Sequence, residues 1–571
     1  MDRLGIARAL REIGRLIALK GDAPFRSRAY ERAARALEKL PGEVGPLVAA
    51  GELTRLRDIG PRIAAVIGDL HRTGEAAVLT RLRAELPPGV LELAEVPSLS
   101  LSRISALHAA LGIDSVAALE AACLAGRVRA LPGFGAATEA RILEGVGERA
   151  RRGTAVPIHV ALEVGEQLLA HLRAWPGTEA AELAGALRRR HESVERVPVV
   201  VATGDPEGAR ARFLRFPTIE AAVPAHGAAL TARLVGGVEA ELRTASRTEY
   251  AVVLNEATGS EAHRRRLLAL AVERGLVLQE RQLRSGPRTV RVDDEAGLYG
   301  HLGLAWIPPE LREDLGEVEA ALAGELPADL VAADDVRGLV HCHTRYSDGR
   351  NTVEEMARAA EALGMDYITI TDHSPTASYA GGLTLDRLRR QWDEIARVQE
   401  SVRVTILRGT ESDILADGSL DYPDAVLEQL DVIVASIHTR HKMDSDQMTR
   451  RLVRAMRLPY FKVWGHALGR LVGRRPPIEC RLEEVLDAAA ASRVAVEVNG
   501  DPRRLDMPPE GVRAARARGV PFVISTDAHS VAELRNLRHG VDAARRGWVR
   551  RGEVLNVLPA EGFRRAVRPA G

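Results

Sequence analysis

The sequence predicts a multidomain chain: a helical amino-terminal region, a mixed α+β middle and an α/β barrel at the carboxy terminus. Three observations support this. The 571 residues exceed what one hydrophobic core usually organises. Residues 1–150 have the pattern of short helices joined by glycine turns, and strand-like stretches begin only after Val156. Residues 336–571 repeat one unit, an apolar strand ending in polar residues and followed by a helix. Seven such units indicate a distorted (βα)7 barrel.

Composition narrows the classes of partner. The net charge is +1, so any contact with nucleic acid must come from local basic patches. Three widely spaced cysteines argue against a disulfide framework and favour a reducing, cytoplasmic location. No apolar run has the length of a signal peptide or a membrane span. We therefore expect a monomer that does not associate with membranes.

Two glycine turns stand out among the amino-terminal helices. One, at residues 58–63, precedes an apolar helix, and the other, at residues 131–136, precedes a second helix. A turn of this kind exposes backbone N–H groups at a helix N-terminus, where a phosphate can dock without reading sequence. This helix-hairpin-helix interpretation predicts DNA contacts, although an ordinary turn between helices remains the alternative. The expected contact residues are Gly60, Arg62, Gly133 and Gly135.

The stretch LKGDAPFRSRAYERAARALEKLP resembles the small 5′-end-binding domain of bacterial family-X DNA polymerases (PolX). The resemblance implies domains at residues 1–80 and 81–150, the second a helix-hairpin-helix and fingers region, with gapped or nicked DNA as the ligand. Family members with deoxyribose-phosphate lyase activity use a lysine nucleophile after the first hairpin, where this chain has Val66. The residues implied to face phosphate are Arg26, Arg28, Tyr30 and Arg32.

The resemblance continues through AGALRRRHESVERVPVVVA, TEYAVVLNEATGSEAHRRRLLALAVERGL and LYGHLGLAWIPPELRED. It implies a nucleotidyltransferase-like palm at residues 151–235 and a thumb at residues 236–320. Arg188 and Arg189 match the family pattern, and we expect them to contact DNA. The Thr258-Gly259-Ser260 turn matches as well.

The polymerase chemistry departs from the family pattern. Phosphoryl transfer needs carboxylates that hold two magnesium ions. The family's D-x-D pair falls here on Arg196 and Pro198, and its third carboxylate position on Glu241. We therefore predict a palm that folds and holds DNA, without a Mg²⁺ pair and without polymerase activity. The other departures from the pattern are Gly185-Ala186, Glu256-Ala257 and Arg264.

After a predicted linker at residues 321–335, the barrel strands end in side chains that bind metals. Because the carboxyl ends of parallel barrel strands meet at one mouth, these side chains should converge there. Mixed histidine and carboxylate sites suit Zn²⁺ or Mn²⁺. Nine such residues argue against the alternative of hydrogen-bonded core histidines. They are His341, His343, Asp348, His373, Glu411, His438, His466, Asp527 and His529.

These strand ends are similar to the polymerase-and-histidinol-phosphatase (PHP) domain that PolX chains carry at residues corresponding to 336–571. The resemblance implies three metal ions. His341, His343, Glu411 and Asp527 would hold the first, and Glu411 would bridge to the second. The second would also take His438 and His466, and Asp348, His373 and His529 would hold the third.

The ligand set predicts phosphoester hydrolysis, with His341, His343, Glu411, Asp527 and Arg470 as the catalytic group. Arg440, Lys442 and Arg470 follow strand ends and could clamp phosphate, although a solvated surface charge is the alternative for each.

We expect a DNA-repair 3′→5′ exonuclease, with cleavage at abasic sites as a further option. The alternatives are a gap-filling repair polymerase with PHP proofreading, a phosphatase for a small phosphomonoester, and a DNA-binding scaffold without activity.

Overall fold

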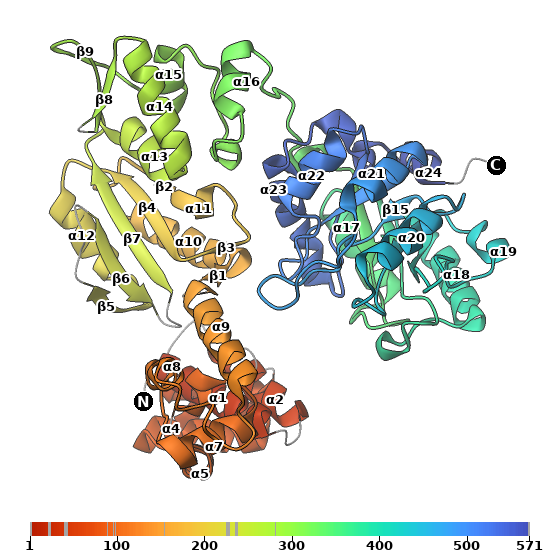
Figure 1. Ribbon diagram of the computed structural model, residues 1–571, viewed down its shortest axis with the longest axis horizontal. Helices are drawn as coiled ribbons and strands as arrows, with labels where there is room; N and C mark the ends of the chain where they lie inside the picture. The colour runs from red at the N-terminus through yellow and green to blue at the C-terminus, as the bar shows by residue number, and fades with distance from the viewer. Residues whose placement is uncertain are drawn as a thin grey trace. The chain divides into compact units, whose positions relative to one another are not determined.

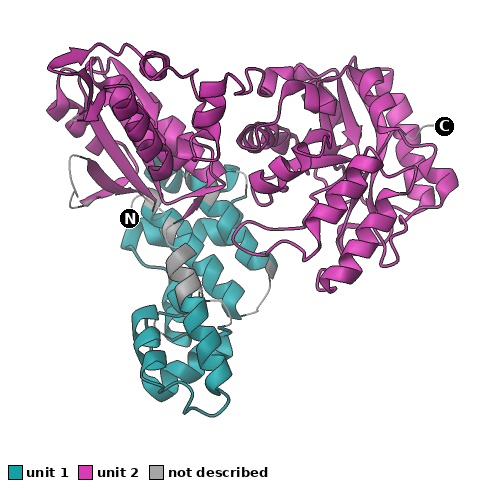
Figure 2. Ribbon diagram, turned by 45° about the horizontal axis from the view of Figure 1, so that its top comes forward, with its two compact units in different colours: residues 1–153 teal, residues 154–571 magenta. Residues whose placement is uncertain are grey.

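The computed structural model describes residues 3–20, 24–38, 44–56, 58–87, 89–94, 96, 99–152, 155–223, 229–234, 238–279 and 281–568. The chain forms two compact units, residues 1–153 and residues 154–571 (Figure 2). The two units differ in class, because the first is helical and the second contains every sheet that the described residues form.

The first unit packs short helices around one apolar core. Ile6, Leu10 and Ile13 of the first helix are fully buried, and so are Ala33, Ala34 and Leu37 of the second. Two turns lead directly into helices with exposed first residues, as the glycine pattern predicts. The elements are α1 (Arg3–Lys20), α2 (Pro24–Glu38), α3 (Gly45–Ala49), η1 (Leu53–Arg55), α4 (Pro61–Thr73), α5 (Ala77–Glu85), α6 (Val90–Leu93), α7 (Leu101–Leu111), α8 (Val116–Leu124) and α9 (Ala136–Arg152).

Among the described residues, no single helix is both long and apolar enough to cross a membrane. The pair α7 and α8 meets the length and composition test only when the two are taken together, and they are bent by 70°.

The second unit begins with a five-stranded sheet in the order β2-β4-β7-β6-β5 (Figure 1). The central strands β4 and β7 are parallel, and the outer pairs are antiparallel. The sheet extends past residue 235, where the sequence predicted the palm to end, because β7 pairs with β4 along its whole length. The elements are β1 (Val156–Pro157), α10 (Ile158–Arg173), β2 (Ala180–Leu183), α11 (Gly185–Arg188), β3 (Ser193–Val194), β4 (Arg196–Ala202), α12 (Pro206–Leu214), β5 (Ile219–Val223), β6 (Leu230–Leu234) and β7 (Glu239–Ala245).

Helices and a small antiparallel sheet follow, in the order β10-β9-β8. A buried polar contact joins the helices, since His263 lies 2.5 Å from Glu317 through Nδ1 and 3.0 Å from the Tyr299 hydroxyl through Nε2. The elements are α13 (Tyr250–Thr258), α14 (Glu261–Glu273), β8 (Val277–Gln279), β9 (Gln282–Ser285), β10 (Arg288–Val290), α15 (Glu295–His301), η2 (Pro309–Leu311), α16 (Glu317–Ala323) and η3 (Ala333–Asp335).

The carboxy-terminal part is a seven-stranded parallel sheet with its strands in sequence order. It closes on itself, because the Thr526 N–H donates to the Val340 carbonyl at 3.1 Å and Cys342 forms a parallel bridge with Ala528. This confirms the predicted (βα)7 barrel. The strands are β11 (Gly338–Cys342), β12 (Tyr367–Ile370), β13 (Thr405–Asp413), β14 (Val432–Ser436), β15 (Val463–Trp464), β16 (Ala495–Asn499) and β17 (Phe522–Ser525).

Helices connect and cover these strands. The first of them starts at a capping box, where the Thr352 N–H donates to Glu355 and the Glu355 N–H donates to the Thr352 hydroxyl. The principal helices are α17 (Val353–Ala362), α18 (Leu385–Gln399), α19 (Asp424–Leu427), α20 (Ser445–Met456), α21 (Leu482–Ala491), α22 (Pro509–Arg516), α23 (Leu537–Arg546) and α24 (Ala560–Val567).

Candidate functional site

The structure brings all nine predicted ligand residues to the carboxyl ends of the barrel strands. They form four overlapping groups in which one nitrogen or oxygen atom of each residue lies within 4.8 Å of the others. Neighbouring groups share residues, so the cluster is continuous. The groups are His343, Asp348, His373 and His529; His341, His343 and Asp527; His341, Glu411 and His466; and His373, Glu411 and His438.

The Glu411 carboxylate lies at the centre of this cluster and is 1% exposed. Its Oε1 is 2.7 Å from Nε2 of His466 and 3.2 Å from Nε2 of His438. Its Oε2 is 2.9 Å from Nδ1 of His373 and 3.3 Å from Nε2 of His341. Because the two oxygens face different imidazoles, this carboxylate has the arrangement of a bridging ligand.

His341 and His343, which are two positions apart, reach the cluster from a distorted strand. Strand pairing shifts register between Leu339 and Cys342, and His341 has a φ of 65°. The expected alternation of an ideal strand therefore does not hold here, and a bulge turns the side chain instead. The imidazole rings of His341 and His343 nevertheless face the same centre, with centroids 5.1 Å apart. Asp527, on the neighbouring strand end, also has a positive φ, 47°, so the backbone is strained at several ligand positions.

The donor atoms fit a group of divalent cations. Within the described part of the chain, several buried imidazole nitrogens of the cluster form no hydrogen bond, although Nδ1 of His373, Nε2 of His438 and Nε2 of His341 lie 2.9 to 3.3 Å from Glu411 oxygens. Native proteins rarely leave such atoms unpaired, so their convergence indicates cations between them. The buried His, Glu and Asp clusters are thus consistent with a site for several metal ions. The unpaired atoms are Nε2 of His341, both ring nitrogens of His343, Nδ1 of His373, Nε2 of His438 and Nδ1 of His466.

The electrostatics of the cluster keep its carboxylates ionised. Burial alone would raise the pKa of Glu411, but the imidazoles of His438, His373 and His341 lower it well below its usual range. Burial lowers the pKa of His343 to about 3, and the adjacent His529 adds to the effect. A neutral imidazole is the form that binds metal, so His343 is already in that form near neutral pH.

Sequence reasoning missed the residues that orient the ligands. Glu497 on β16 accepts a hydrogen bond from Nδ1 of His341 at 2.6 Å and another from the His466 backbone N–H. Asp413 lies 3.3 Å from Nδ1 of His438. Asp527 Oδ2 lies 3.0 Å from Nε of Arg504 and 3.2 Å from Nδ2 of Asn499. The position of Glu497 inside the apolar run VAVEVNG could have indicated its role, because a charged residue is unusual in a buried strand. The loop that carries Arg504 has no periodicity that would indicate such a role.

The three predicted phosphate clamps differ in their surroundings. Arg470 is 9% exposed, lies 2.7 Å from Glu192 and also donates to the Leu505 carbonyl. Its guanidinium is therefore engaged within the chain, and its catalytic role stays a prediction. Arg440 and Lys442 are exposed just past the end of β14.

The first unit gathers most of the predicted DNA contacts at one place. A surface hollow of about 820 Å³ is lined by Arg26, Tyr30, Arg32, Gly60 and Arg62. One acidic residue, Asp58, also lines the hollow, and its carboxylate lies 3.1 Å from Nε of Arg32. The predicted residue Arg28 is exposed on the same helix but does not line the hollow.

Both glycine turns leave open space beside the helix that they introduce. A methyl group added at Gly60, Gly133 or Gly135 would meet no atom within 4 Å. A phosphate could therefore approach the backbone N–H groups of either turn, as the helix-hairpin-helix interpretation requires.

In the five-stranded sheet, the three predicted degenerate positions are neighbours. Pro198 on β4 is paired with Glu241 on β7, and Arg196 Nη1 lies 3.0 Å from Glu241 Oε2. Arg243 contacts the other oxygen of Glu241 at 2.7 Å. The Glu241 carboxylate is thus neutralised by two guanidinium groups.

Arg188 and Arg189, predicted to bind DNA, are held by partners within the chain. Arg188 lies 2.6 Å from Glu295 and Arg189 lies 2.7 Å from Glu313, and both donate to Thr258. The two side chains are 17% and 12% exposed. Contact with DNA stays a prediction for both, and the structure shows that they join the end of α11 to α13, to α15 and to the segment that carries Glu313.

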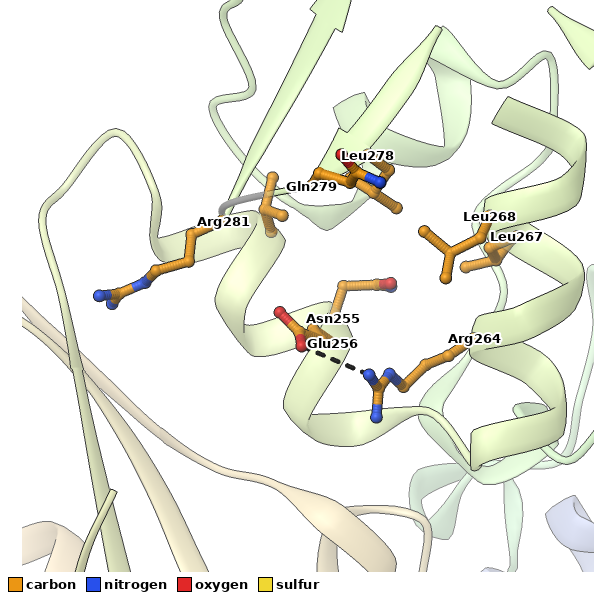
Figure 3. Close-up of a pocket in the computed structure, with 9 residues that line it drawn as sticks. Asn255, Glu256, Arg264, Leu267, Leu268, Leu278, Gln279 and Arg281 are labelled. Atoms are coloured by element: carbon orange, nitrogen blue, oxygen red, sulfur yellow. Dashed lines mark hydrogen bonds and ion pairs between the residues drawn. The ribbon is translucent and has the colours of Figure 1, made fainter. Parts of the chain in front are cut away.

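A pocket of about 240 Å³ lies between α13, α14 and β8 (Figure 3). Its walls are apolar, with Leu267, Leu268 and Leu278, and its rim carries the ion pair of Glu256 and Arg264 at 3.4 Å. At these two rim residues the sequence predicts a departure from the PolX pattern.

Comparison with known families matches three parts of the chain. Three family descriptions apply: helix-hairpin-helix domain at residues 1–76, DNA polymerase beta thumb at residues 253–313, and PHP domain at residues 340–500. Part of the chain is also similar to probable phosphatases. One from Caldanaerobacter subterraneus subsp. tengcongensis is 30% identical over 201 residues, covering 33% of this chain and 74% of the relative. One from Thermoanaerobacter sp. (strain X514) is 26% identical over 229 residues, covering 38% and 88%.

A further relative matches from end to end. The DNA polymerase/3′-5′ exonuclease PolX of Bacillus subtilis (strain 168) is 33% identical over 565 residues, which cover 97% of this chain and 97% of the relative. This match confirms the resemblance found in the sequence. DNA binding is implied by the family and by the helix-hairpin-helix domain. The chain therefore belongs to the PolX family, with a carboxy-terminal PHP domain.

Proposed function

We propose that this chain is a metal-dependent 3′→5′ exonuclease whose active site is the residue cluster at the mouth of the barrel. The observation that carries the proposal is the convergence of nine ligand-type side chains, with unpaired donor atoms, at one set of strand ends. The name of the Bacillus relative includes this activity, and the helix-hairpin-helix domain provides a surface for DNA.

Three divalent ions, Zn²⁺ or Mn²⁺, are the proposed cofactors. His341, His343, Glu411 and Asp527 would hold the first, and Glu411 would be shared with the second. The second would also take His438 and His466, and the third would take Asp348, His373 and His529. Ions in such a site supply a hydroxide nucleophile near neutral pH and neutralise charge on a phosphoryl group.

The chain's own residues prepare this site. Glu497 holds the hydrogen on Nδ1 of His341, which directs the Nε2 lone pair toward the cluster. Arg504 and Asn499 occupy Oδ2 of Asp527, which leaves Oδ1 facing His343 at 3.5 Å. Burial of Glu411 and His341 at the base excludes water from all but the outer ligands.

The polymerase domain raises a second question. The Bacillus relative carries both activities in its name, so the comparison favours the alternative of a gap-filling polymerase with PHP proofreading. Against that alternative stand the residues at the expected carboxylate positions. Arg196 and Pro198 cannot ligate Mg²⁺, and Glu241 is paired with two arginines. We propose on this basis that the palm binds DNA without extending it. We also propose that the ion pair of Glu256 and Arg264 occupies part of the place where a polymerase would bind its nucleotide.

A phosphatase acting on a small phosphomonoester is the remaining candidate. The similarity of part of the chain to probable phosphatases favours it. The helix-hairpin-helix domain at residues 1–76 argues for a polymeric substrate instead.

One experiment separates the three activities. Gapped DNA labelled near its 3′ end is incubated with Mn²⁺, with and without deoxynucleoside triphosphates, using wild type, His341→Ala and the control His301→Ala, an exposed histidine of α15. Shortening lost only in His341→Ala supports the exonuclease. Template-dependent lengthening that His341→Ala retains supports the polymerase. Release of phosphate from p-nitrophenyl phosphate without action on DNA supports the phosphatase.

A further inference from the structure

Tyr379 is an exposed aromatic side chain on a firmly held loop. The residue is 69% exposed, whereas Ala377 and Leu383 are fully buried and Ala380 is 4% exposed. The loop connects β12 to α18 and contains a single short helix, η4 (Ser378–Ala380). The side chain is therefore displayed to solvent by neighbours that are anchored in the core.

Hydrogen bonds hold both ends of this loop. The Thr376 N–H and hydroxyl donate to the two Asp421 oxygens, each at 2.6 Å. The Leu383 N–H donates to the His373 carbonyl at 2.8 Å, and the Tyr422 hydroxyl donates to the Leu383 carbonyl at 2.6 Å. A loop pinned in this way presents its tyrosine in a defined position, at low entropic cost for a ligand.

The position is the opening of the metal-ligand cluster. The outer ligands Asp348 and His529 have side chains that are 37% and 21% exposed, whereas His341 and Glu411 are 0% and 1% exposed. The cluster thus opens to solvent on one side.

Tyr379 lies next to this opening of the cluster. Its ring centroid is 6.3 Å from the His373 ring and 6.3 Å from the His438 ring. No other aromatic side chain of tyrosine, phenylalanine or tryptophan type has a ring contact with a cluster histidine among the described residues. When a phosphoester binds at the cluster, the group attached to its phosphate must lie at the edge of the site. The ring of the exposed Tyr379 lies at that edge.

We propose that Tyr379 stacks on the 3′-terminal nucleobase of the DNA and so positions the terminal phosphodiester over the metal ligands. This inference rests on the proposed exonuclease function and adds its substrate contact. Aromatic stacking tolerates any base, because every base has a π-face, which suits an exonuclease that removes nucleotides in succession. A side chain that stacks on a base also favours the 3′ end of a DNA strand over a small phosphomonoester that has no base.

The test compares substrates with and without the terminal base. Wild type, Tyr379→Ala and Tyr379→Phe are assayed with Mn²⁺ on a single-stranded oligonucleotide, on the same oligonucleotide ending in a tetrahydrofuran abasic residue, and on bis-p-nitrophenyl phosphate. Tyr460→Ala is the matched control, because this tyrosine precedes β15 at the opposite end of the barrel and its hydroxyl contacts Glu428. Metal content is measured for every variant.

Stacking predicts a specific pattern. Tyr379→Ala raises KM for the base-bearing end roughly 5- to 100-fold with a smaller change in kcat. The same substitution leaves the activity on the abasic end and the metal content close to wild type. Tyr379→Phe behaves like wild type on all three substrates, because the ring and not the hydroxyl carries the contact.

Other outcomes overturn the proposal. An equal loss on all three substrates, or a loss of bound metal, assigns Tyr379 to the structure of the metal site. A loss in Tyr379→Phe equal to that in Tyr379→Ala assigns the effect to the hydroxyl. If wild type degrades DNA and Tyr379→Ala does so equally well, only this inference fails. If wild type degrades no DNA, the proposed function itself fails.

Discussion

Nδ1 of His341 donates a hydrogen bond to Oε1 of Glu497 at 2.6 Å, and both side chains are fully buried. Glu497 also accepts from the backbone N–H of His466, so one carboxylate orients two of the proposed metal ligands. Partners of this kind fix the tautomer of a ligating histidine and raise its basicity. The relationship makes Glu497 part of the site although it lies outside the predicted ligand set.

Substitution of Glu497 by glutamine should weaken metal binding while leaving the fold intact. Glutamine keeps the shape but loses the negative charge, so we expect an affinity for Mn²⁺ or Zn²⁺ that is about 10- to 100-fold lower. Metal titration followed by elemental analysis measures it. Glu484→Gln, on the exposed face of α21, serves as the control. Unchanged metal content in Glu497→Gln would show that the hydrogen bond to His341 has no part in metal binding.

Removal of metal should lower thermal stability. The cluster buries Glu411 and Asp527 among histidines, and a cation that binds only the folded chain stabilises it by mass action. At a free metal concentration of one hundred times Kd, each site contributes about 2.7 kcal/mol. We expect the unfolding temperature of chelator-treated protein to rise by several degrees when Mn²⁺ is restored, and to rise less in His466→Ala. Equal shifts in the two proteins would place the bound metal elsewhere.

The ion pairs of Glu313 with Arg189 and His191 should make the free energy of unfolding depend on pH in the acid range. Burial alone would raise the pKa of Glu313, but its hydrogen bond with His191 and the charge of Arg189 lower that pKa from 4.5 to about 2. A lowered folded-state pKa contributes stability that is fully present above about pH 4.5 and is lost as the pH falls toward 2. A shift of this size corresponds to roughly 3 kcal/mol at most.

Glu313→Gln tests this dependence by thermal unfolding at several pH values. The difference in stability from wild type should be largest at pH 6 to 7 and should shrink below about pH 4.5. Glu319→Gln, an exposed partner of Arg266, is the control. A difference that stays constant down to pH 3 would contradict the proposed role of the ionised carboxylate.

The sequence predicted the barrel and its nine candidate ligands because both follow local patterns. Each strand is a short apolar run, and each ligand stands at its end, so the parallel topology alone brings them together. Contacts between residues that are far apart in the sequence depend on tertiary packing, and they were not predictable in this way. Arg504 reaches Asp527 from a loop without periodicity, and Arg188 and Arg189 find carboxylates more than one hundred residues away. The bulge at His341 is likewise a property of strand pairing and not of the motif.

The hollow of the first unit should bind DNA through Arg62. This residue is exposed in the first turn of α4, two positions after Gly60, and it lines the hollow together with Arg26 and Tyr30. Arg62→Ala should weaken binding of 5′-phosphorylated gapped DNA several-fold and reduce the salt dependence by about one counterion, equally for different sequences.

Arg72→Ala is the matched control for this prediction. It removes the same charge from the last turn of the same helix, where Arg72 is paired with Asp69 at 2.8 Å. Fluorescence anisotropy over a range of salt concentrations measures both quantities. If the two variants lose affinity equally, the effect reflects net charge and not a phosphate contact at the hairpin. If only Arg62→Ala loses affinity, and loses less on DNA without the 5′-phosphate, the contact is assigned to that phosphate, because the open space beside Gly60 gives the phosphate access to both the guanidinium and the helix N-terminus.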